Sequence, residues 1–117
     1  MHIKKLYEIK RPVISFEVFP PKQESSVETV TGVLSGMAKQ KPGFISVTYG
    51  AGGHGNNSKT IEIASHIKNE LGTEQMAHLT CIGATKPQIS PILSEMKNSG
   101  IETIMELRGD LPEGVCE

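Results

Sequence analysis

Four short runs of β-forming residues recur along the 117-residue chain, and each of the first three precedes a stretch with helical spacing of its apolar residues. The runs begin near residues 13, 44, 76 and 101, so successive starts are 31, 32 and 25 residues apart. Alternating strands and helices predict parallel strand pairing with right-handed crossovers. We therefore expect an α/β fold, either a doubly wound sheet or a (β/α)8 barrel.

The three expected helices have recognisable ends. The first begins at a capping-box pattern, Ser25 followed by Glu28, and runs to about Lys39. The second is expected over residues 59–71 and ends at a glycine, and the third over residues 87–99, with a proline at its first position. Start and stop signals of this kind are typical of short helices that alternate with strands.

A complete (β/α)8 barrel needs about 250 residues, so four strands and three intervening helices amount to about half of one. The sequence stops at Glu117, after a loop and before the helix that should cover the fourth strand. We therefore expect residues 1–117 to form the N-terminal half of a single barrel, in a chain that looks truncated. Residues 1–12 precede the first strand as a short helix or an arm.

Composition excludes several classes of partner. The formal net charge is -1 and only 4% of residues are aromatic, which predicts neither a nucleic-acid surface nor binding to an anionic membrane. No apolar run is long enough for a membrane-spanning helix, and no secretory signal follows the N-terminus. The two cysteines, Cys81 and Cys116, form neither a CxxC pair nor a disulfide framework. We therefore expect a cytoplasmic protein.

A carboxylate interrupts the first β-forming run, residues 13–19, which two prolines terminate. Because side chains alternate along a strand, Glu17 shares a face with Ser15 and Phe19. If the more apolar face of this strand packs against the helices, Glu17 lies on the opposite face, which points toward the inside of the protein. A buried carboxylate must be hydrogen-bonded, paired with a cation or kept protonated, and each state suits a catalytic acid. The alternatives are a solvent-exposed edge position or a structural ion pair.

Polar residues gather where the other strands end, and ligands of parallel α/β folds bind at that end. Each residue taken alone has a structural explanation, such as an ordinary strand threonine, a core histidine or a surface ion pair. Their convergence on one rim favours a site. The inward-facing and rim residues are Glu17, Ser46, Thr48, His78, Thr80, Arg108, Gly109 and Asp110.

The glycine-rich segment 50–58 is a loop rather than a phosphate-binding fingerprint, because it has neither Gly-Lys-Ser/Thr nor a following Rossmann acid. His54, beside two asparagines, is expected to be solvated. We see no cluster of carboxylates or cysteines at metal-ligand spacing, and so predict no metal site.

Four blocks of the sequence occur together in one known family. They are Ser15-Phe16-Glu17-Val18-Phe19-Pro20-Pro21-Lys22, Ser46-Val47-Thr48-Tyr49-Gly50-Ala51, His78-Leu79-Thr80-Cys81 and Leu107-Arg108-Gly109-Asp110-Leu111-Pro112. In order and spacing they resemble the N-terminal part of the methylenetetrahydrofolate reductases. The resemblance covers nearly the whole chain.

The resemblance implies a (β/α)8 barrel with FAD at its C-terminal face. NADH or NADPH would reduce the flavin, which would then reduce 5,10-methylenetetrahydrofolate to 5-methyltetrahydrofolate, in one-carbon and methionine metabolism. By family role Glu17 would protonate the folate, and Asp110 would stabilise the resulting cation. A homo-oligomer is implied for the complete enzyme. The positions matching flavin or nicotinamide contacts are Thr48, Tyr49, Ala51, His78, Arg108, Gly109 and Asp110.

The sequence is also compatible with other functions. Family members often carry charged residues after the position of Ala51, whereas residues 52–58 are uncharged here apart from His54, which bears on nicotinamide specificity. A non-catalytic half-barrel that binds a second copy of itself is one alternative, because open sheet edges favour pairing. Another is a different barrel enzyme that uses Glu17 and Asp110 on another carbon acid or a sugar.

Overall fold

The computed structural model describes residues 2–21, 27–49, 57–111 and 113–114. They form one four-stranded sheet in the order β1-β2-β3-β4, and every neighbouring pair of strands is parallel. The strands are β1 (Ser15–Val18), β2 (Phe44–Val47), β3 (Gln75–Thr80) and β4 (Ile104–Leu107). The expected parallel α/β sheet is confirmed.

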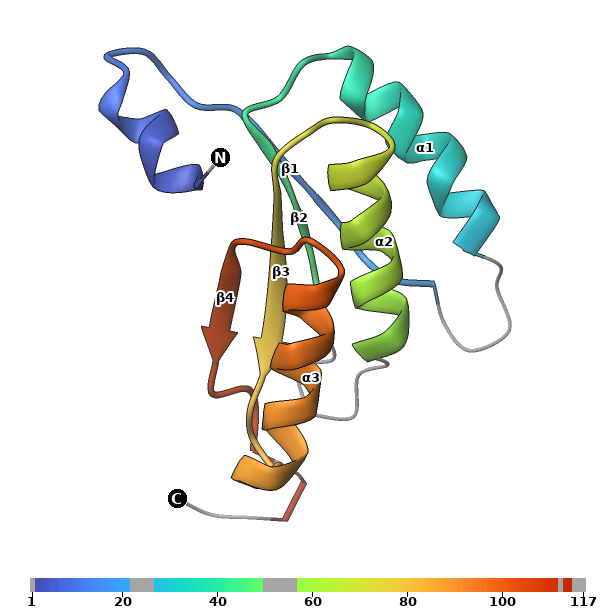
Figure 1. Ribbon diagram of the computed structural model, residues 1–117, viewed down its shortest axis with the longest axis vertical. Coiled ribbons are helices and arrows are strands. Elements are labelled where there is room, and N and C mark those ends of the chain that lie inside the picture. The colour runs from blue at the N-terminus through green and yellow to red at the C-terminus, as the bar shows by residue number, and fades with distance from the viewer. Residues whose placement is uncertain (1, 22–26, 50–56, 112, 115–117) are drawn as a thin grey trace.

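One helix follows each of the first three strands: α1 (Val27–Lys39), α2 (Asn57–Asn69) and α3 (Lys86–Asn98). Figure 1 shows all three on the same face of the sheet. A doubly wound fold has helices on both faces and a strand order that reverses, so this sequential, one-sided arrangement is that of a partial (β/α)8 barrel. A short 3-10 helix, η1 (Ile3–Glu8), precedes β1.

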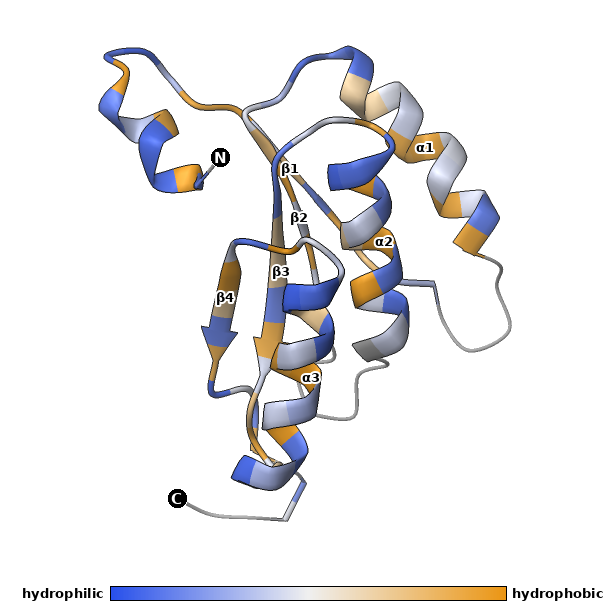
Figure 2. Cartoon of the chain, in the orientation of Figure 1, coloured by the Kyte–Doolittle hydropathy of each residue, from blue (hydrophilic) through white to orange (hydrophobic). Residues whose placement is uncertain are grey.

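The core lies between the sheet and these helices, with α2 at its centre. In Figure 2 each helix carries both hydrophobic and hydrophilic residues, because only the side toward the sheet is buried. β2 lies between two other strands and under α2, and all four of its residues are buried. The buried hydrophobic cluster consists of Val18, Leu34, Ile45, Val47, Ile61, Ile63, Ala64, Ile67, Ala77, Leu79, Met96 and Ile101.

Local signals end the helices as the sequence predicts. At the start of α3 the Thr85 N–H donates to Oε1 of Gln88 at 2.8 Å, and Gly100 follows its end with a φ of 81°, a left-handed conformation that favours glycine. The capping box at Ser25 lies outside the described residues. No helix within the described ranges is long and apolar enough to cross a membrane.

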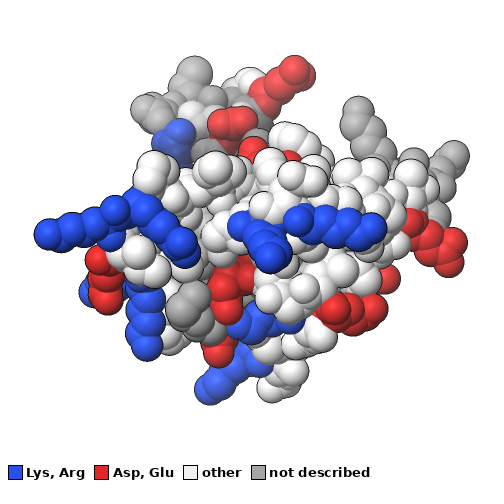
Figure 3. All heavy atoms as spheres, turned by 90° about the horizontal axis from the view of Figure 1, so that it is seen from above, with Lys and Arg blue, Asp and Glu red and all other residues white. Residues whose placement is uncertain are grey.

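Basic residues in the last turns of the helices lie at the N-terminal end of the sheet. Lys39, Lys68 and Lys97 occupy these turns, where a cation stabilises the helix dipole. The Lys68 ammonium also lies 2.8 Å from Oε1 of Glu74, in the loop before β3. Figure 3 views this end and shows positive and negative side chains intermixed. The described residues therefore form no extended surface of a single charge at this end.

Two adjacent residues of α1 test this packing. Leu34 is fully buried, whereas Val33 is 56% exposed. We expect Leu34→Ala to lower the free energy of unfolding by about 2–5 kcal/mol, because it leaves a cavity under α1. Val33→Ala should change it by less than about 0.5 kcal/mol. Urea unfolding followed by circular dichroism measures both, and equal losses in the two variants would show that α1 is not packed as described.

Candidate active site

The strand register decides which side chains share the face of the sheet away from the helices. Glu17 of β1 pairs with Ser46 of β2, and Thr80 of β3 pairs with Leu107 of β4. Paired residues in adjacent strands point to the same side. The sequence alone does not decide which face of the fourth strand points inward, because its apolar residues occur on both faces. The pairing places Leu107 beside the inward-facing residues of β3.

A hollow of about 580 Å³ lies on this face at the C-terminal ends of the strands. Its volume is within the range of small-molecule sites. Glu17 and Asp110, from the first strand and from the loop after the fourth, both line it. Its lining residues are Glu17, Phe19, Thr48, Tyr49, His78, Thr80, Leu107, Arg108, Gly109 and Asp110.

The hollow is lined by every predicted site residue that the structure describes except Ser46, which is buried in β2 beneath Glu17's carboxylate and hydrogen-bonds to it. Ala51 lies outside the described residues. Two lining residues were not predicted. Phe19 follows β1 directly and lies two residues after Glu17, so the alternation of side chains could have indicated it. Leu107 could not be assigned from the sequence, because either face of the fourth strand was possible.

Glu17 is held at one oxygen. The Ser46 hydroxyl donates to Oε1 of Glu17 at 3.4 Å, and Nε2 of His78 lies 3.8 Å from the same oxygen. The prediction that Glu17 is enclosed is wrong, because 49% of its side chain is exposed. β1 is an edge strand and α1, α2 and α3 pack against the other face, so this face is open in the described residues.

Two other groups in the hollow have hydrogen-bonding capacity for a ligand. The Thr80 hydroxyl is buried and has no hydrogen-bond partner among the described residues. Burying such a group unpaired costs free energy, which a ligand acceptor can offset. Burial and the nearby Cys81 raise the pKa of Tyr49, so its phenol stays protonated and able to donate near neutral pH.

These features fit a flat heterocycle with polar edges. Phe19 and Leu107 are exposed apolar surfaces in the hollow, at 69% and 38% exposure. Thr80 and Tyr49 offer hydroxyl groups, and Arg108 offers a positive charge. A flavin has this combination of an apolar ring system with carbonyl and amide edges. The residues present therefore fit the cofactor that the sequence resemblance implies.

Cys81 follows β3 and lines a different hollow, next to α3. The pKa of the Cys81 thiol is raised, mainly by burial. The negative charge of Glu106 also raises it, and Sγ of Cys81 lies 3.7 Å from Oε1 of that residue. Since the thiolate is the reactive form, the thiol is expected to be inert near neutral pH.

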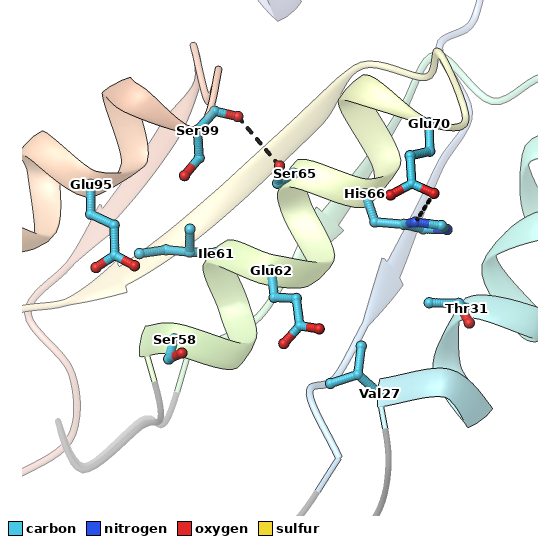
Figure 4. A pocket seen from close by; sticks show the side chains of 10 residues that line it. All are labelled: Val27, Thr31, Ser58, Ile61, Glu62, Ser65, His66, Glu70, Glu95 and Ser99. Carbon is cyan, nitrogen blue, oxygen red and sulfur yellow. Dashed lines mark hydrogen bonds and ion pairs between the residues drawn. The ribbon is translucent and has the colours of Figure 1, made fainter.

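A further hollow, of about 430 Å³, lies in the helix layer rather than at the strand ends (Figure 4). There Nδ1 of His66 lies 3.1 Å from Oε2 of Glu70, four residues later on α2, which is the spacing of an ordinary helix pair. None of the predicted site residues lines it. No group of three potential metal ligands occurs within the described part of the chain.

A sequential parallel sheet with helices on one face defines part of a (β/α)8 barrel, and polar side chains gather in a candidate site at the C-terminal ends of its strands. The family model for methylenetetrahydrofolate reductase matches residues 2–116. The chain belongs to the methylenetetrahydrofolate reductase family, as the sequence blocks predicted.

Its relatives are longer proteins. The chain is 42% identical to the 5,10-methylenetetrahydrofolate reductase of Escherichia coli, over 86% of this chain and 34% of the relative. The Salmonella typhimurium protein of the same name is 41% identical with the same coverage. Methylenetetrahydrofolate reductase (NADH) 1 of Zea mays is 39% identical over 89% of this chain and 17% of the relative. The chain thus spans about a third of the bacterial relatives.

Two buried threonines test the role of the Thr80 hydroxyl. Thr80→Val should leave the free energy of unfolding unchanged or raise it by up to about 1 kcal/mol, because it removes an unpaired buried hydroxyl. Thr60 is equally buried, but its hydroxyl donates to the Thr48 carbonyl at 3.0 Å. Thr60→Val should therefore cost about 1–2 kcal/mol in the same urea titration. A loss of that size in Thr80→Val would mean that Thr80 already has a partner.

Alkylation rates test the environment of Cys81. In a Cys116→Ser background, iodoacetamide at pH 8 should react more slowly with folded Cys81 than with the urea-unfolded chain. The raised pKa leaves less thiolate, and the rate should increase only as the pH rises further. Glu106→Gln removes a negative charge that disfavours the thiolate, so the rate should rise about threefold. Equal rates in the folded and unfolded chains would contradict this environment.

Proposed function

We propose that the protein containing this chain is a flavin-dependent reductase that converts 5,10-methylenetetrahydrofolate to 5-methyltetrahydrofolate. Membership of the family supports this reaction. The observation that carries the proposal is the shared hollow, where Glu17, Asp110 and the described candidate cofactor residues meet at the C-terminal ends of the strands.

FAD is the proposed cofactor, and a reduced nicotinamide is the proposed electron donor. When bound, a flavin would supply the chemistry of hydride transfer between the nicotinamide and the folate. The name of the maize relative specifies NADH, which favours NADH over NADPH. The residues proposed to hold these groups are Thr48, Tyr49, Ala51, His78, Arg108, Gly109 and Asp110.

The two carboxylates have different proposed roles. Glu17 would donate a proton to a folate nitrogen, so that the one-carbon bridge opens to a cationic form. Asp110 would stabilise that cation electrostatically from the opposite side of the hollow. Their environments differ, since Glu17 contacts Ser46 and His78 on the sheet, while Asp110 lies in the loop after β4.

We further propose that residues 1–117 form the N-terminal half of one barrel in a cytoplasmic homo-oligomer. The outer edges of β1 and β4 would then pair with further strands of the complete barrel. The alternative is a half-barrel that closes by pairing with a second copy. Purified full-length protein should be yellow with a flavin absorption band, whereas a colourless dimer would support the alternative.

A single substitution tests the role of Glu17 in the full-length protein. Glu17→Gln cannot donate the proton, so oxidation of the reduced flavin by methylenetetrahydrofolate should slow by about a hundredfold or more. Reduction of the flavin by NADH should stay within about threefold of the unaltered protein, because that step needs no proton from Glu17. Stopped-flow absorbance separates the two steps.

Glu62→Gln is the matched control, because it makes the same change at an exposed position of α2 in the helix-layer hollow. Both of its half-reactions should be unchanged. If Glu17→Gln slows the two half-reactions equally, Glu17 is not the specific acid of the folate step.

A further inference from the structure

Ser46 is the one polar residue in β2, the most buried strand of the sheet. Its neighbours in β2 are Phe44, Ile45 and Val47, and no residue of the strand is more than 7% exposed. An aliphatic residue would satisfy this position by packing, whereas a buried hydroxyl needs a hydrogen-bond partner. That partner is Oε1 of Glu17, which pairs with Ser46 across the two strands.

A second buried polar side chain reaches the same oxygen. His78 comes from β3, its side chain is only 11% exposed, and its Nε2 lies 3.8 Å from Oε1 of Glu17. Two polar side chains from two different strands therefore converge on Oε1. Both contacts are made to Oε1, and neither is made to Oε2.

We infer that Ser46 and His78 are positioning residues that hold Oε1 of Glu17, so that Oε2 is the atom that carries and delivers the proton. This inference rests on the proposed function. In the proton-transfer step the Oε2–H bond breaks and an N–H bond forms on the folate nitrogen. The negative charge then left on the carboxylate is stabilised by the hydroxyl of Ser46, with Nε2 of His78 3.8 Å from the same oxygen, and Glu17 regains its proton from water.

The two contacts also restrict the rotamer of Glu17. Half of the side chain is exposed, and a glutamate in that situation otherwise samples several rotamers. A fixed Oε1 leaves Oε2 in a limited set of positions over the hollow. Holding a reacting group near its productive geometry lowers the barrier of the reaction.

Ser46→Ala in the full-length, flavin-loaded protein tests the inference. It should slow oxidation of the reduced flavin by methylenetetrahydrofolate about tenfold and leave reduction of the flavin by NADH within twofold. Ser46→Thr, which keeps a hydroxyl, should recover most of the folate rate. The pH above which the folate step slows should be higher in Ser46→Ala, because a donor that favours the charged carboxylate has been removed.

The pH profile must be compared between variants, because other titratable groups line the hollow. They are His78 on β3, Tyr49 after β2, and Arg108 and Asp110 after β4. Ser15→Ala is the matched control, since Ser15 is an exposed serine of β1 on the same face as Glu17. Its rates and pH profile should equal those of the unaltered protein.

The inference is overturned if Ser46→Ala leaves the folate step within twofold, slows both half-reactions by the same factor, or is not recovered by Ser46→Thr. An unshifted pH profile would also overturn it. The Glu17→Gln variant tests the proposed function separately. A normal folate step in that variant would show that Glu17 takes no part in the chemistry, whatever the result for Ser46→Ala.

Discussion

The parallel register of the strands is the constraint on which the candidate site depends. Pairing Glu17 with Ser46, and Thr80 with Leu107, places polar side chains of different strands on one face. The same register sends Ile45, Val47 and the other alternate residues into the core under the helices. A shift of one residue in any pair would exchange the two faces, so the core and the site are specified together.

Much of the fold follows from local patterns in the sequence. Apolar runs bounded by glycine and proline located all four strands and the helices that connect them, with boundaries within a few residues. The fourth strand shows where this reasoning stops. Its apolar residues occur on both faces, and pairing with β3 puts Glu106 on the side of Cys81 and Leu107 in the hollow. That choice depends on contacts distant in sequence.

The solvent exposure of Glu17 could not be predicted from the residues near it in the sequence either. Alternation along β1 gave its face correctly, and that face was then assumed to be enclosed because the helices cover the other one. The described sheet is open there, so half of the side chain is exposed and its two contacts come from neighbouring strands. Sequence patterns identify which face a residue takes, but what covers that face is a property of the complete architecture.

The face of the sheet that carries Glu17 combines polar groups that folding alone does not require. A buried serine in β2 and a threonine hydroxyl without a partner among the described residues both weaken the sheet relative to aliphatic side chains. Both lie on the face that carries Glu17. Such departures from efficient packing are typical of sites where structure is adapted to a ligand.

The most direct measurement is a crystal structure of the full-length protein with bound flavin. The flavin ring should lie against the C-terminal ends of β1 to β4, in contact with His78 and Thr80, with Glu17 and Asp110 facing the same bound ligand. A flavin bound in the helix layer, or at the N-terminal end of the sheet, would contradict this arrangement.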